Sequence, residues 1–125
     1  MQSKELKNKL GSLRPLGEQV CASLCGELHK LGLDESKIPD IRFDAASFDL
    51  EKDVYSGEKS LRGDWLTERK ARLGSIVFHS DGSFFAEYDV VHPHPSDERW
   101  FIEAITAWGR DGEIKSEARL LPAIG

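Results

Sequence analysis

The spacing of apolar residues changes abruptly about a third of the way along the chain. Up to residue 31 they recur every three or four positions, the spacing of one helical face: Leu6, Leu10, Leu13, Gly17, Val20, Leu24, Leu28 and Leu31. From Ile41 onward apolar and polar residues alternate, as in half-buried strands. This change predicts an α+β fold, in which an N-terminal helix packs on an antiparallel β-meander of about five or six strands.

Local signals set the limits of the helical part. Ser3 is suited to cap its N-terminus, and Gly32 with Pro39 ends it. Pro15 lacks the backbone N–H that a continuous helix uses, so we expect a kinked helix or a helical hairpin. From the length of 125 residues we expect a single domain, with a helical cover at 1–33 and an antiparallel sheet at 41–121.

The first strands are predicted from alternation. In "IRFDA", residues Ile41, Phe43 and Ala45 would face inward. The stretch "FDLEKDVYSGEKS" predicts the end of a strand and a turn at Ser56-Gly57. Two more strands follow in "LRGDWLTERKARLGSIVF".

Asp81-Gly82 lies between two β-rich runs and predicts a hairpin with a two-residue loop. That loop would place His79 opposite Phe84 and Val77 opposite Ala86. Alternation then divides the second strand between two faces, with Phe84, Ala86, Tyr88 and Val90 on one and Phe85, Glu87, Asp89 and Val91 on the other.

Asp111-Gly112 predicts a second hairpin, between Trp100–Trp108 and Glu113–Leu121. A helix is the rival interpretation of 100–108, because its apolar residues also fit a helical face with Ser96 as N-cap. Its aromatic and β-branched content favours the strand.

Charge and composition restrict the function. The net charge of -5 argues against a surface for nucleic acid or anionic lipid and favours a basic protein partner. The chain lacks a secretory or membrane-spanning apolar run, so we expect a cytoplasmic protein. Cys21 and Cys25 lie one helical turn apart, and we interpret them as reduced, buried side chains.

The stretch "FFAEYDVVHPHP" raises the question of a metal or catalytic site. His92, His94, Glu87 and Asp89 offer nitrogen and carboxylate ligands. Each histidine precedes a proline, however, which favours a strand ending at Val91 and a stiff loop. Glu87 and Asp89, with Glu103 on a neighbouring strand, are also candidates for acid–base chemistry.

The sequence contains no nucleophile elbow, phosphate loop or dinucleotide fingerprint. We therefore expect a protein that is not an enzyme and holds neither a cofactor nor a metal. The residues predicted to bind a partner are the acids and rings around this stretch, with its two histidines: Glu87, Tyr88, Asp89, His92, His94, Trp100 and Glu103.

The segment "SIVFHSDGSFFAEYDV", within 75–90, resembles the bacterial YezG-type immunity family. The features shared with that family are a strand, the Asp81-Gly82 turn, Phe84 or Phe85, and a strand ending in Tyr88-Asp89. The resemblance implies a small, acidic, cytosolic α+β protein that neutralises a toxin by binding it.

Three functions remain as hypotheses. The favoured one is an interaction domain that acts by binding a protein partner, with the immunity-like protein as its sharpest form. The second is a small metal- or ligand-binding enzyme that uses the sheet face and the His-Pro-His-Pro loop. The third is a self-associating structural domain, a homodimer formed through an open sheet edge or an aromatic face.

Overall fold

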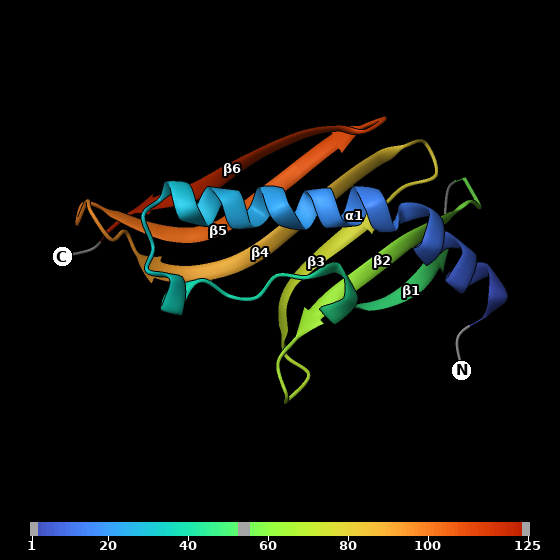
Figure 1. Cartoon of the computed structure of the whole chain (residues 1–125), viewed down its shortest axis with the longest axis horizontal. Coiled ribbons are helices and arrows are strands. Elements are labelled where there is room, and N and C mark those ends of the chain that lie inside the picture. Colours follow the sequence, from blue (N-terminus) through green and yellow to red (C-terminus); the bar gives the residue numbers. More distant parts are fainter. Residues whose placement is uncertain (1–2, 53–55, 124–125) are drawn as a thin grey trace.

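The chain forms one long helix packed on a six-stranded antiparallel sheet, as the computed structural model shows (Figure 1). The structure describes residues 3–52 and 56–123, so part of the loop expected around 53–57 lies outside the described residues. The elements are α1 (Lys4–Lys30), two short 3-10 turns at Glu35–Lys37 and Phe43–Ala45, β1 (Ser47–Lys52), β2 (Lys59–Leu66), β3 (Arg72–Phe78), β4 (Ser83–Pro93), β5 (Trp100–Arg110) and β6 (Glu113–Pro122). The predicted α+β class is confirmed.

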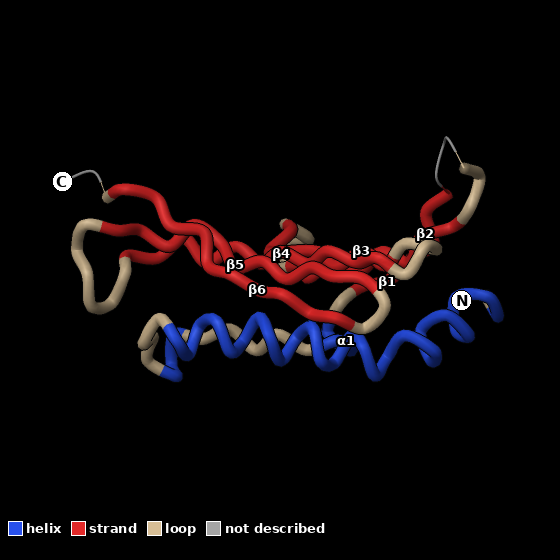
Figure 2. Tube along the Cα trace, turned by 90° about the horizontal axis from the view of Figure 1, so that it is seen from above, coloured by secondary structure: helices blue, strands red, loops and turns tan. Residues whose placement is uncertain are grey.

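The sheet is a simple meander. Its spatial order β1-β2-β3-β4-β5-β6 equals the chain order, and every neighbouring pair is antiparallel. Trp100–Arg110 is a strand, which decides against the helical rival. Figure 2 shows α1 on one side of the sheet, and in the described part of the chain no element covers the other side.

The helix α1 is continuous, so the helical-hairpin alternative is wrong. Ser3 caps it as predicted, with its hydroxyl oxygen accepting the Leu6 N–H at 3.1 Å. Pro15 lies inside the helix and cannot donate to the carbonyl one turn earlier. Figure 1 shows the axis of α1 changing direction in its N-terminal part, as expected for a kinked helix.

The core lies between the apolar stripe of α1 and one face of the sheet, which we call the core face. Val20, Leu24 and Leu28 of α1 are fully buried, as are Leu61 and Ile76 of the sheet. The segment 33–46 runs back along the same side and adds Leu33, Ile41 and Phe43 to the core. One side of the sheet therefore holds the main apolar core.

The strand predicted at Ile41–Ala45 is wrong, although Ile41 and Phe43 are buried as expected. Phe43–Ala45 is a 3-10 turn, Ala45 is exposed, and the first strand begins at Ser47. The carbonyl of Arg42 accepts the Trp65 indole N–H at 2.9 Å and the Ala45 N–H at 3.1 Å. These bonds use the carbonyl that a strand would offer to a neighbour.

The two Asp-Gly turns have different geometries. Asp111 and Gly112 both have positive φ, 54° and 85°, in the two-residue loop that was predicted. At the other turn Gly82 has φ 90° but Asp81 is not left-handed, and the His79 N–H donates to the Ser83 carbonyl at 2.8 Å. The hairpin between β3 and β4 therefore has a three-residue loop.

Because of this loop, the register between β3 and β4 differs by one residue from the predicted register. Phe78 faces Phe84, and Val77 faces Phe85 instead of Ala86. The carboxylate of Asp81 accepts both the N–H and the hydroxyl of Ser83, at 2.9 and 2.6 Å, which supports the turn conformation observed. As a result, Val77 and Phe85 lie side by side on the face of the sheet that α1 leaves uncovered.

Strand β4 continues past the predicted end at Val91 and stops at Pro93. Its pairing with β3 ends at Tyr88, so the later residues form an edge on that side, where a proline is tolerated. A bulge between Asp89 and His92 gives Val91 a φ of 49° and lets His92 pair with Ile102.

At Gly17 the helix α1 lies directly against the Phe43 ring. A Cβ atom on Gly17 would overlap the Phe43 ring, whereas a Cβ on Gly26 of the same helix would meet no atom within 4 Å. We expect Gly17→Ala to lower the free energy of unfolding by about 1–3 kcal/mol, as overpacking does. Gly26→Ala should raise it by about 0.5–1 kcal/mol through helix propensity.

Chemical denaturation of both variants measures these opposite changes. Equal stabilisation by both substitutions would show that Phe43 does not pack against Gly17.

Candidate functional site

The uncovered side of the sheet, which we call the open face, carries an apolar row at its centre. Val77 pairs with Phe85, and Phe85 pairs with Trp108, so three neighbouring strands each contribute one side chain. Phe85 is 44% exposed, and Val77 and Trp108 are half-buried. These three residues, named the apolar row below, form a continuous hydrophobic strip that faces solvent.

Polar and acidic side chains lie beside the apolar row. The adjacent line of paired residues runs across β2 to β6: Asp64, Ser75, Glu87, Thr106 and Glu117. Asp89 follows Glu87 on the same face of β4 and is exposed. The open face therefore presents an apolar strip with carboxylates along one side.

Arg119 partly neutralises these carboxylates. Its guanidinium lies 3.2 Å from Glu87 Oε1 and 2.8 Å from Glu103 Oε2. The charge of Glu87 is the main cause that raises the pKa of Arg119. Asp89 and Glu117 form no ion pair with any residue that the structure describes, and both carboxylates remain available.

Glu87, Asp89 and Glu103, three of the predicted binding residues, thus lie on the open face. Tyr88 does not belong with them. It is only 7% exposed, points toward the core face, and its ring centroid is 5.7 Å from that of Trp65. Burial is the main cause that raises its pKa. Alternation along β4 separates Tyr88 from both of its neighbours.

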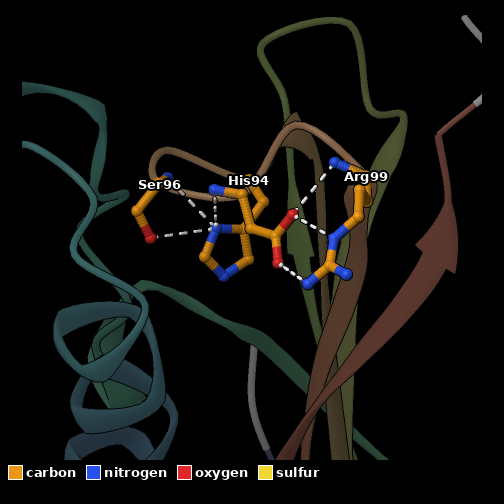
Figure 3. Close-up of polar contacts among 4 residues, drawn as sticks. His94, Ser96 and Arg99 are labelled. Atoms are coloured by element: carbon orange, nitrogen blue, oxygen red, sulfur yellow. Dashed lines mark hydrogen bonds and ion pairs between the residues drawn. The ribbon is translucent and has the colours of Figure 1, made fainter.

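His92 lies near the end of β4, His94 in the loop that follows, and Trp100 at the start of β5. The bare Nδ1 of His94 accepts the N–H groups of Ser96 and Asp97, each at 3.1 Å (Figure 3). His92 Nδ1 lies 2.6 Å from the Pro93 carbonyl oxygen, an acceptor, so it carries the proton. Both imidazoles therefore hold the loop in shape.

Within residues 3–52 and 56–123, no group of three or more His, Cys, Asp or Glu side chains is placed to hold a metal. The loop itself lines an open depression of about 510 Å³, formed by residues 94–99. Of its two carboxylates, Asp97 is already paired with Arg99, at 2.8 Å between Oδ2 and the guanidinium, and Glu98 is the other. The arrangement is typical of a rigid loop.

Asp97 makes this loop sensitive to acid. Hydrogen bonds from the Arg99 side chain, then from its backbone N–H, lower the pKa of Asp97 from 3.8 to about 2. Because the folded-state pKa is depressed, this stabilisation is present above pH 3.8 and is lost as the pH falls through about 2. We expect Asp97→Asn to destabilise the protein at neutral pH and to match the wild type near pH 2.

Denaturation at several pH values, with an NMR titration of the Asp97 carboxyl, tests this expectation. In Arg99→Gln the titration should move back toward the ordinary value. An unchanged Asp97 midpoint in that variant would show that Arg99 is not the cause.

Two features were not found from the sequence. A polar depression of about 410 Å³ lies beside the Asp81-Gly82 turn, where Ser60 Oγ is 3.2 Å from His79 Nδ1 and Ser80 bonds to Glu58. The second feature that the sequence did not reveal is the apolar row, because Trp108 lies next to Phe85 only through the pairing of β4 with β5. That pairing depends on the loop after β4 and on the bulge between Asp89 and His92, which no local signal predicts.

The two cysteines line a cavity of about 330 Å³ between α1 and the segment 41–44. Both thiols are free. Burial is the main cause that raises the pKa of Cys21, to about 12, and it also raises that of Cys25. Neither thiol is suited to act as a nucleophile at neutral pH.

Comparison with known protein families, with curated proteins and with solved structures finds no match for this chain. Of the helices described, none combines the length and apolar character that crossing a bilayer requires.

Proposed function

We propose that this chain is a protein-interaction domain, and that it acts by binding a basic protein partner through its open face. The observation that carries the proposal is the apolar row of Val77, Phe85 and Trp108 at the centre of the open face, where Phe85 is 44% exposed. Aromatic side chains in such a position are typical of the residues that dominate binding energy at protein interfaces.

The unpaired carboxylates of the open face favour a basic partner. Asp89 and Glu117 lack ion pairs among the described residues, and the chain as a whole carries a net charge of -5. A partner that places Lys or Arg beside these carboxylates gains attraction, and a guanidinium above Phe85 or Trp108 adds a cation–π contact. An acidic partner would instead meet unpaired like charges.

Neutralisation of a toxin is the sharpest form of this proposal. The resemblance of residues 75–90 to the YezG-type immunity family supports it, and this is the hairpin that supplies Val77, Phe85 and Asp89 to the open face. In this form the partner stops growth when produced alone and does not when it is produced together with this chain.

Substitutions on the open face test the proposal. A partner recovered with the tagged chain is purified, and its affinity is measured by titration calorimetry. We expect Phe85→Ser to weaken binding by about thirtyfold, the loss typical of a central aromatic residue. Asp89→Lys should weaken it by about tenfold, and raised salt should weaken binding of the wild type.

Two matched variants serve as controls. Leu121→Ser removes an apolar side chain that is 43% exposed near the end of β6, and Glu18→Lys reverses an exposed acid on α1. Both should bind the partner like the wild type. A partner whose affinity survives Phe85→Ser and Asp89→Lys unchanged would refute the assignment of the open face.

A further inference from the structure

Strand β6 forms one edge of the sheet, and along its outer side it has no neighbour in the described part of the chain (Figure 1). It is ten residues long, against six for β1 at the opposite edge. Unpaired N–H and C=O groups along such an edge can bond to another strand. We propose that β6 pairs with β6 of a second copy of this chain, which gives a homodimer with one continuous sheet.

The backbone direction suits this pairing. Arg110 and Glu113 flank the two-residue Asp111-Gly112 turn and form the first pair of the hairpin. Such flanking residues exchange both of their hydrogen bonds. The β5–β6 register then runs without interruption to Arg119, so the peptide groups of 114, 116 and 118 point outward.

The charges of β6 are complementary to themselves. On the open face the strand carries Glu113, Lys115, Glu117 and Arg119, an alternation of acid and base. An antiparallel pair with its two-fold axis at Ser116 places Glu113 opposite Arg119 of the second copy. It also places Lys115 opposite Glu117. Every charged residue in this stretch therefore meets the opposite charge, and Glu117 gains the ion pair that it lacks within its own chain.

Neighbouring registers do not have this property. An axis at Lys115 sets that residue against its own copy and Glu113 against Glu117. An axis at Glu117 sets Glu117 against itself and Lys115 against Arg119. Since like charges directly opposite each other are unfavourable, the charge pattern selects the axis at Ser116.

A two-fold axis normal to the sheet puts both α1 helices on the same side and leaves both open faces free. Ser116 lies on the core side, where its hydroxyl donates to Glu27 of α1 at 2.8 Å, so the centre of the strand is held in place. Dimerisation through β6 therefore pairs Glu117 but leaves the apolar row and Asp89 free to bind a partner.

A charge exchange tests the proposal with the whole chain. Sedimentation velocity at concentrations up to about 100 µM should show a dimer for the wild type, in the range that a micromolar dissociation constant requires. Lys115→Glu alone or Glu117→Lys alone should weaken the dimer by about tenfold or more, because each puts like charges opposite one another at two places.

The double variant K115E/E117K restores opposite charges across the axis and keeps the net charge, so it should dimerise like the wild type. Phe85→Ser should leave the dimer unchanged. A wild type that stays monomeric over the whole range overturns the proposal. So does a dimer that tolerates both single reversals, or one that Phe85→Ser abolishes, since either result places the contact elsewhere. Circular dichroism verifies that each variant is folded.

Discussion

The structure depends on burying the apolar stripe of α1 against one face of the sheet. Val20, Leu24 and Leu28 are completely inaccessible, and the fully buried strand residues Leu61, Ile76 and Ile105 lie on the other side of this contact. The chain has one long helix and one returning segment to serve as cover, and both lie on the same side. The six strands consequently have one face in the core, and no described segment covers their other face, which is where we expect the function.

The opposite sides of the sheet differ in how tightly their side chains are held. On the core face, rings contact one another, with centroids of Phe43 and Phe48 at 4.7 Å and of Phe78 and Phe84 at 6.3 Å. On the open face, the apolar row is accompanied by ion pairs among partly exposed groups, such as Arg119 with Glu87 and Glu103. Exposed pairs of this kind add little stability. Their arrangement therefore bears more on what the face can bind than on whether the chain folds.

Much of this could be predicted from the sequence, because the signals involved are local. The three-to-four spacing of leucines defined α1, alternation assigned the faces of β4, and Asp111-Gly112 located the second hairpin. Other features depend on contacts between distant residues. The Trp65 indole N–H donates to the Arg42 carbonyl, which is then not available for pairing in a strand. The Asp81 carboxylate accepts a hydrogen bond from Ser83 in a three-residue loop. The second of these decides that Val77 lies next to Phe85, so the centre of the candidate site could not be read from alternation alone.

One face of the sheet meets solvent, while α1 covers the other. Phe84 and Phe85 are neighbours on β4, yet one is 3% exposed and the other 44%. A soluble paramagnetic probe, added during NMR measurement of the aromatic protons, compares the two rings within one molecule. We expect strong broadening of the Phe85 signals and little change for Phe84. Equal protection of both rings would contradict this expectation, because the sheet would then be covered on both sides.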